Sequence, residues 1–172
     1  MLYIDGDFDD APPDPQTCQS AAAMAVWLLT HASPFCAGPH LQPAQVSVLG
    51  WTKPTRCPEP GMNSISLEDV RRRGAGTTIR EVLAAIPASA NILVHFDTDV
   101  LADGEFPATY FPHKDGFTTQ QTAEVLGPVL ADDRVRLVEI SEYSMLRDLD
   151  RVWIQKLVET LSDALRNKPA QS

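Results

Sequence analysis

Aspartates recur at alternate positions in two separate segments of this 172-residue chain. One group, Asp5, Asp7 and Asp9, follows a short apolar run, and a second group, Asp97 and Asp99, follows another. Gathered carboxylates repel one another and are costly to desolvate unless a cation lies between them. Their hard oxygen atoms favour Mg²⁺, Mn²⁺ or Ca²⁺ over softer metals. The spacing therefore predicts a divalent-metal site that holds one or two ions and uses all five aspartates.

Strands must position these side chains. The apolar runs 2–4 and 92–96 are short and continuous, which is typical of parallel strands covered on both faces. Ligands bind such sheets outside the carboxyl ends of the strands. We therefore expect both groups of aspartates to meet at one edge of the sheet.

The remaining pattern alternates strands with helices. It predicts further strands at 46–50 and 135–140, helices at 20–30, 67–73, 78–86, 119–130 and 149–166, and irregular loops at 51–64 and 102–117. This order indicates an α/β fold with a mainly parallel sheet in a three-layer α/β/α arrangement. Neither the length nor the composition suggests a second domain, so we expect residues 1–172 to form one domain.

Charge and composition argue against some classes of binding partner. The net charge of −9 and a pI near 4.7 argue against a nucleic-acid partner or an anionic membrane surface. The basic run Arg71–Arg73 is interpreted as a solvated helix end. No apolar stretch approaches the roughly 20 residues that span a bilayer, and the N-terminus lacks a signal-peptide pattern, so a cytoplasmic protein is expected. The three cysteines have no metal-type spacing and are interpreted as reduced thiols.

Several segments together resemble the ureohydrolases, the family that includes arginase and agmatinase. The resemblance is carried by residues 95–101 (HFDTDVL), 106–109 (FPAT), 116–118 (GFT), 3–9 (YIDGDFD) and 137–140 (LVEI). They agree with that family in order and spacing. The resemblance implies an arginase-like fold that lacks the first strands, because the chain begins at the family's first aspartate strand.

The resemblance also implies roles for individual residues. Asp5, Asp9, Asp97 and Asp99 fall on metal-ligand positions, with the first and third as bridging carboxylates, and Glu139 falls on the position that faces the substrate. The implied activity is hydrolysis of a guanidino or amidino C–N bond in a small molecule, by a hydroxide that bridges two Mn²⁺ ions.

Three departures from the family pattern suggest that activity is reduced or lost. Asp7 stands where the family has a histidine ligand, although an aspartate can also bind Mn²⁺. Ala22 stands where many arginases carry a histidine. Finally, the family takes a further histidine ligand from a segment before its first aspartate strand, and this chain, which begins at that strand, is expected to lack the segment. Which guanidino compound is used stays open, because substrate selectivity lies largely in loops that do not align.

Two alternatives remain. In the first alternative the chain is a non-catalytic metal-binding or assembly module that pairs an open sheet edge with another copy and forms a homo-oligomer. In the second it is a phosphatase. In the phosphatase interpretation Asp5 attacks phosphorus and Asp7 acts as acid or base, which leaves the second aspartate pair unexplained. His31, His40 and His113 are interpreted as surface or capping residues, and His95 as a buried, hydrogen-bonded histidine.

Overall fold

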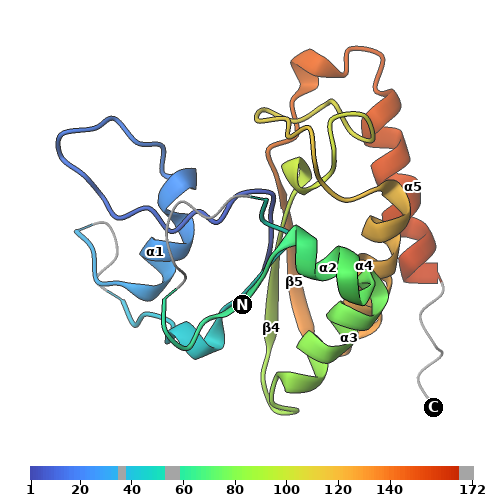
Figure 1. Cartoon of the computed structure of the whole chain (residues 1–172). Helices are drawn as coiled ribbons and strands as arrows, with labels where there is room; N and C mark the ends of the chain where they lie inside the picture. Colours follow the sequence, from blue (N-terminus) through green and yellow to red (C-terminus); the bar gives the residue numbers. More distant parts are fainter. Residues whose placement is uncertain (35–37, 53–58, 167–172) are drawn as a thin grey trace.

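The computed structural model describes residues 1–34, 38–52 and 59–166. Its five strands form one parallel sheet in the order β3-β2-β1-β4-β5 (Figure 1). The strands are β1 (Leu2–Ile4), β2 (Ser47–Leu49), β3 (Asn63–Ile65), β4 (Ile92–Asp97) and β5 (Val135–Ser141). The parallel sheet confirms the α/β fold expected from the sequence.

The helices follow the sequence pattern closely. They are α1 (Ala25–Thr30), α2 (Leu67–Arg73), α3 (Ala75–Ala85), α4 (Thr119–Ala131) and α5 (Val152–Arg166), with 3-10 turns at Ala22–Met24, Pro43–Gln45, Thr98–Val100 and Met145–Arg147. The Ser66 side chain caps α2, and Thr118 with Gln121 forms a capping box for α4. The helix expected at 20–30 is shorter, since its first residues form a 3-10 turn.

One strand lies in a segment that was expected to be irregular. Asn63–Ile65 pairs with Ser47–Leu49 as an edge strand at the end of the loop 51–64. Its sequence, Asn-Ser-Ile, is short and mostly polar, so it carries no strand periodicity. Pairing with β2 creates this strand, and such pairing is not visible in a local pattern.

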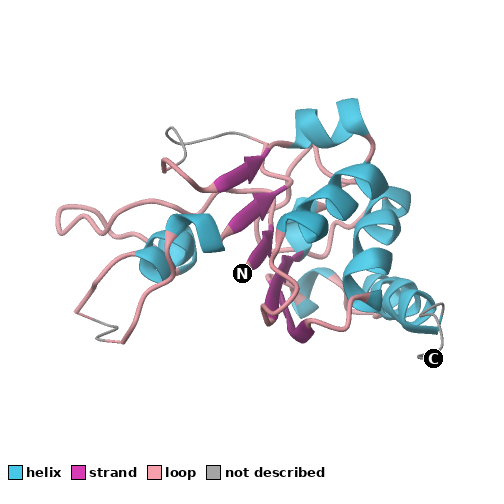
Figure 2. Ribbon diagram, turned by 90° about the horizontal axis from the view of Figure 1, so that it is seen from below, coloured by secondary structure: helices cyan, strands magenta, loops and turns pink. Residues whose placement is uncertain are grey.

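The two faces of the sheet are covered unequally. Helices α2 to α5 lie on one face, where they bury residues such as Ile4, Phe96 and Val125 (Figure 1). On the other face α1 packs over β1 and β2. Figure 2 shows that the strands separate α1 from helices α2 to α5. Over β4 and β5 this face is open, with Leu93 46% and Leu137 56% exposed. The expected three-layer arrangement is therefore complete only over β1 and β2.

The strand order places a topological switch point between β1 and β4. The chain runs from β1 outward to β2 and β3, then returns to the opposite side of β1 as β4. Crevices form at the carboxyl ends of two such strands because their connections leave in opposite directions. The two groups of aspartates follow these two strands.

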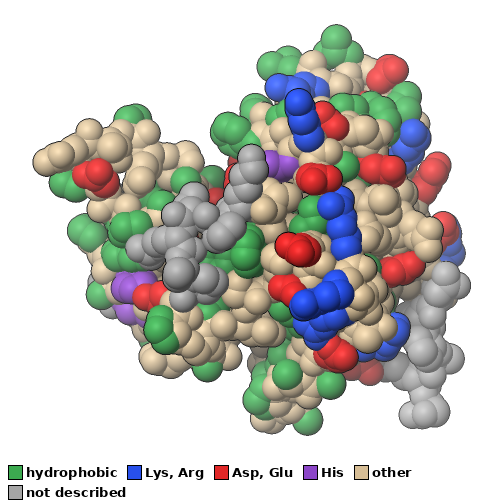
Figure 3. Space-filling model, viewed as in Figure 1, with side chains coloured by type: hydrophobic (Ala, Val, Ile, Leu, Met, Phe, Trp, Pro, Cys, Tyr) green, Lys and Arg blue, Asp and Glu red, His purple; other side chains and the backbone are tan. Residues whose placement is uncertain are grey.

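The basic run Arg71–Arg73 ends a helix, as the sequence suggested. Arg71, Arg72 and Arg73 end α2, and each pairs with a carboxylate, on Asp115, Asp69 and Glu81 respectively. On the face of the molecule that Figure 3 shows, blue Lys and Arg side chains lie next to red Asp and Glu side chains. No helix among the described residues is long and apolar enough to cross a membrane. Cys18 is an exposed free thiol, and Cys36 and Cys57 lie outside the described residues.

Candidate metal centre

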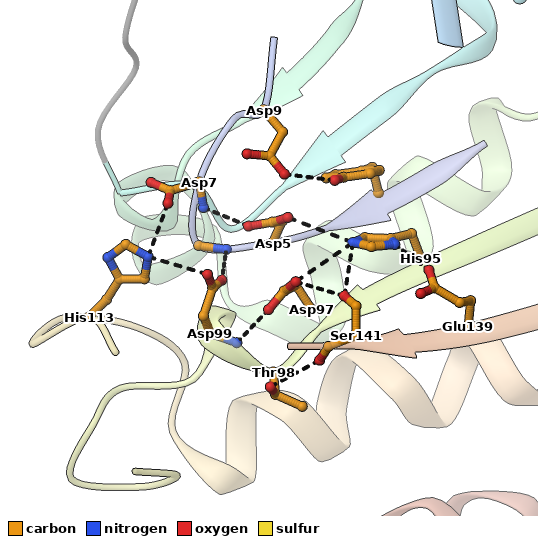
Figure 4. Close-up of polar contacts among 12 residues, drawn as sticks. Asp5, Asp7, Asp9, His95, Asp97, Thr98, Asp99, His113, Glu139 and Ser141 are labelled. Carbon is orange, nitrogen blue, oxygen red and sulfur yellow. Dashed lines mark hydrogen bonds and ion pairs between the residues drawn. The ribbon is translucent and has the colours of Figure 1, made fainter. Parts of the chain in front are cut away.

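The turns after β1 and β4 bring the aspartates together (Figure 4). Asp5 is 1% exposed, and Asp97 and Asp99 are each 4% exposed. The two turns repeat one local structure: the Asp7 amide donates to Asp5 Oδ1 at 2.7 Å, and the Asp99 amide donates to Asp97 Oδ1 at 2.8 Å. These bonds fix the first carboxylate of each pair against its own turn.

Burial makes this cluster electrostatically unfavourable in the absence of a cation. Burial, followed by repulsion from Asp99, raises the pKa of Asp5 well above its usual value, and the same two causes raise the pKa of Asp97 to about 8. Burial also raises the pKa of Asp9 to about 6. A divalent cation relieves both causes, because it replaces lost hydration and compensates the negative charges.

Two groups of described residues have the geometry of metal ligands. Asp5, His95 and Asp97 form one group, and Asp7, Asp99 and His113 form the other. In each group the candidate ligand atoms lie within 4.8 Å of one another. Carboxylate oxygens suit Mg²⁺, Ca²⁺ and Mn²⁺, and imidazole is a common ligand of divalent transition metals. The residues present therefore fit a divalent metal ion such as Mn²⁺, and they include two histidines that the sequence had not assigned to it.

His113 enters the site from a distant part of the chain. Its Nε2 atom lies 3.5 Å from Asp7 Oδ2 and 3.6 Å from Asp99 Oδ2, and the interactions with Asp7 and then Asp99 raise the pKa of His113 to about 10. The sequence predicted a surface or capping position for this histidine because it lies in an irregular loop. The Asp103 amide donates to the His113 carbonyl at 2.8 Å, which folds the loop back on itself.

Gly6 allows the two turns and His113 to approach one another. Its amide donates to Asp99 Oδ1 at 3.0 Å. A Cβ atom at this position would lie 2.7 Å from His113 Cδ2 and 2.9 Å from Asp99 Oδ1, which is closer than real Cβ atoms pack. Any larger residue must therefore displace a candidate ligand.

His95 is held on three sides. Its ring stacks on Tyr3 with the centroids 4.1 Å apart, and its Nδ1 atom hydrogen-bonds to the Glu139 carboxylate. Its Nε2 atom lies 3.7 Å from Asp5 Oδ2 and 3.9 Å from Asp97 Oδ2. The sheet register lines up Tyr3, His95 and Glu139 across three strands, so this arrangement follows directly from strand pairing.

Two other candidates from the sequence lie differently from the rest. The Asp9 carboxylate accepts a hydrogen bond from the Tyr3 hydroxyl at 2.8 Å and belongs to neither ligand group. The Glu139 carboxylate is half exposed and contacts His95. Glu142, which was not among the sequence candidates, lies near enough to Asp97 and Asp99 for their charges to interact, and it has an unusual backbone conformation with φ of 59°.

A cavity of about 170 Å³ lies over the aspartates. It is lined by Asp5, Asp7, Asp9, Ser20, Ala22, Ala23, Asp97, Asp99, Phe111 and Glu142. A cavity of about 430 Å³ between α4 and α5 is lined largely by small residues, and one of about 410 Å³ lies at the amino ends of β1, β2 and β4. Neither of these larger cavities gathers carboxylates, whereas six acidic side chains line the small one.

Known proteins were compared with this chain. The model of the arginase family matches residues 14–162. No curated protein sequence matches significantly. Similar solved structures include Entamoeba histolytica arginase in complex with L-ornithine (TM-score 0.82, 16% identity) and Bacillus subtilis arginase (TM-score 0.82, 18% identity). A third is Trypanosoma cruzi formiminoglutamase with Mn²⁺ (TM-score 0.74, 14% identity).

The extent of these matches is uneven. They cover 96%, 99% and 95% of this chain, but only 59%, 64% and 54% of the respective neighbours. The chain thus spans less than two thirds of the length of these enzymes. At such low sequence identity the likeness establishes the fold.

Proposed function

Since the chain belongs to the arginase family, we propose that it binds one or two Mn²⁺ ions and hydrolyses a C–N bond of a guanidino or amidino compound. The observation that carries this proposal is the meeting of the two carboxylate and imidazole groups at the switch point between β1 and β4. The cavity over them is smaller than typical ligand pockets of roughly 300–1,000 Å³. It would take the reacting head group and leave the rest of the substrate outside.

The proposed metal ligands are the five aspartates named from the sequence. Asp5 and Asp97 are both buried and stand first in the turns that follow the adjacent strands β1 and β4, which favours them as the bridging carboxylates that the resemblance implies. Asp9 lines the cavity and can serve as a ligand only if its carboxylate turns from the Tyr3 hydroxyl. When bound, Mn²⁺ lowers the pKa of a coordinated water and polarises the group under attack.

The glutamates are proposed to act at different ends of the site. Glu139 fixes the Nδ1 side of His95, so that Nε2 faces Asp5 and Asp97, as carboxylates commonly orient metal-binding histidines. Glu142 lines the cavity itself. A guanidinium or amidinium head group is cationic, and an acidic cavity attracts it. We therefore propose that Glu139 acts on the substrate indirectly, by orienting His95, whereas Glu142 faces the substrate directly.

The two alternatives differ in what supports them. In the phosphatase interpretation an anionic phosphate would have to approach Asp5, which is buried beside Asp97 and Asp99. The like charges disfavour this chemistry. A non-catalytic metal-binding module is favoured by one observation, the open face of β4 and β5 in a chain that spans only part of its structural neighbours.

Calorimetry with Mn²⁺ and an assay for released urea, formamide or ammonia test the proposal. Arginine, agmatine, guanidinobutyrate and N-formiminoglutamate cover the guanidino and amidino classes. We expect Mn²⁺ binding and turnover of at least one compound, with both lost in Asp97→Ala and kept in Asp163→Ala, whose carboxylate pairs with Arg166 on α5, outside the cavity over the aspartates. Binding without turnover would favour the non-catalytic module, and a wild-type protein that binds no Mn²⁺ would overturn the proposal.

A further inference from the structure

We propose that His113 supplies an imidazole ligand to a Mn²⁺ ion held by Asp7 and Asp99. This inference rests on the proposed function for the presence of the ion. It assigns a ligand that the sequence pattern did not identify, from the loop 102–117. It would also restore a nitrogen donor next to Asp7, the position at which the resemblance to the ureohydrolases leads one to expect a histidine.

The ring nitrogen of His113 is placed between two carboxylates and bonded to neither. Nε2 is buried, lies 3.5 Å and 3.6 Å from Asp7 Oδ2 and Asp99 Oδ2, and makes no hydrogen bond within the described part of the chain. Buried polar atoms without a hydrogen bond are rare, and a bound ion is one of the recognised reasons for them. Donor atoms that share one ion at about 2.1 Å each lie at most about 4.2 Å apart. Both distances from Nε2 meet this limit, and the three candidate ligand atoms lie within 4.8 Å of one another.

The surrounding structure holds the imidazole in this position. Residues 102 and 113 form a bridge between the two sides of the loop, and the Asp103 amide donates to the His113 carbonyl. Arg71 anchors the following residues to α2 through Asp115 at 3.1 Å and the Gly116 carbonyl at 3.3 Å. The packing at Gly6 leaves no room for the ring to move toward the first turn. The nitrogen is therefore preorganised for an ion rather than carried on a free surface loop.

A purely structural role makes a different prediction. A protonated His113 could simply pair with Asp7 and Asp99, and then no ion would contact its nitrogen. His113→Gln separates the two roles, because glutamine keeps a polar group that can hydrogen-bond both aspartates but lacks an imidazole. His31→Gln is the matched control, since His31 stacks on Trp27 and pairs with Glu59 instead.

The experiment uses the full chain with Mn²⁺ alone as the probe. Calorimetry should show that His113→Gln weakens binding of one Mn²⁺ by about tenfold or more, because even indirect partners of metal ligands contribute 10–100-fold. His31→Gln should bind as the wild type does. Pulsed electron paramagnetic resonance should detect histidine ¹⁴N coupled to Mn²⁺ in the wild type, and this coupling should decrease or vanish in His113→Gln.

Each failure has its own meaning. If the wild type binds no Mn²⁺, the proposed function fails and this inference fails with it. If the wild type binds Mn²⁺ but His113→Gln keeps the affinity, the stoichiometry and the ¹⁴N coupling, only the role of His113 is overturned. If His113→Gln does not fold, the spectrum of His95→Gln decides, because that variant lacks the imidazole of the other group and any remaining histidine coupling, shifted by ¹⁵N-labelled histidine, must come from the group of Asp7, Asp99 and His113. Absence of any histidine coupling in the wild type would also overturn the inference.

Discussion

At the scale of single residues, the buried aspartates lower the stability of the metal-free fold, and the same arrangement brings metal ligands together. A carboxylate without solvent must keep a proton, find a donor or meet a cation. Asp97 has donors in the Asp99 amide and the Ser141 hydroxyl, the latter at 2.6 Å, yet burial and Asp99 still raise its pKa to about 8. Such strain from unfavourable electrostatics is expected where a site is built for binding rather than for stability.

Asp97→Asn tests this trade directly. An amide removes the buried negative charge, keeps an oxygen for the Asp99 amide and can pair with Ser141. At pH 9 with a chelator we expect the melting temperature to rise by a few degrees, which corresponds to about 1 kcal/mol in a chain of this size. Mn²⁺ binding should weaken in the same variant. A lower metal-free melting temperature at pH 9 would show that the charge is not a burden.

Glu139→Gln and Glu142→Gln should separate two roles. Glu139 contacts His95, so its loss should weaken Mn²⁺ binding by about 10–100-fold. Glu142 lines the cavity, so its loss should raise KM for a cationic substrate and leave Mn²⁺ affinity within about twofold. Calorimetry and steady-state kinetics at saturating Mn²⁺ measure these effects. The opposite assignment of KM and affinity effects would place Glu139, and not Glu142, against the substrate.

At the scale of elements, the site depends on how closely the turn after β1 approaches the turn after β4 and the loop 102–117. The sheet alone brings the ends of adjacent strands within a strand spacing of about 5 Å. The Gly6 amide then joins the two turns through Asp99 Oδ1. The cluster therefore requires a residue without a side chain between two acidic turns.

Gly6→Ala should weaken Mn²⁺ binding about as much as loss of the His113 imidazole does. The added Cβ would meet His113 and Asp99 at less than 3.0 Å, so a ligand must shift. Gly104→Ala is the control, because a Cβ at that position meets nothing within 4 Å. Calorimetric affinity is the readout. Equal binding by both variants would mean that the two turns are compliant and that close packing at Gly6 is not needed.

At the scale of the whole molecule, the cluster should govern how stability depends on pH. The carboxyls of Asp9 and Asp97 have folded-state pKa values of about 6 and 8, above the ordinary value, so the folded protein loses stability as pH rises through this range. His113, with a raised pKa of about 10, stabilises fully below about 6.5 and loses that contribution as pH rises toward 10. All three groups act in the same direction.

Metal-free protein should therefore melt at a lower temperature at pH 9 than at pH 5. We expect a difference of about 2 kcal/mol, or roughly 4–8 °C, once solvent screening of the less buried groups is allowed for. Saturating Mn²⁺ should remove most of it, because the ion stabilises the ionised carboxylates and competes with protons. Thermal unfolding by circular dichroism, with and without a chelator, provides the comparison. A flat metal-free profile would contradict the electrostatic account.

The open side of the sheet predicts self-association. The far face of β4 and β5 exposes Leu93 and Leu137, and β5 is an edge strand among the described residues, where a further strand could pair. Light scattering should show dimers or larger species that increase with concentration. Leu137→Lys should reduce association, whereas Leu165→Lys, at an equally exposed leucine on α5, should not. A wild-type protein that stays monomeric at every concentration would remove the prediction of a homo-oligomer.

The sequence by itself determined the strands at 2–4, 46–50, 92–96 and 135–140, the capped helices and the meeting of two aspartate groups at one edge of a parallel sheet. These follow from local periodicity and from the rule that parallel strands end together. Tertiary structure alone decided that His113 reaches the aspartates, that Tyr3 holds Asp9, that Glu139 contacts His95 and that β3 exists. Most of these outcomes depend on contacts between segments far apart in the chain, and even the nearby pair Tyr3 and Asp9 meets only because the turn after β1 folds back. Local sequence periodicity cannot predict such contacts, because they form only when the folded chain brings the segments together.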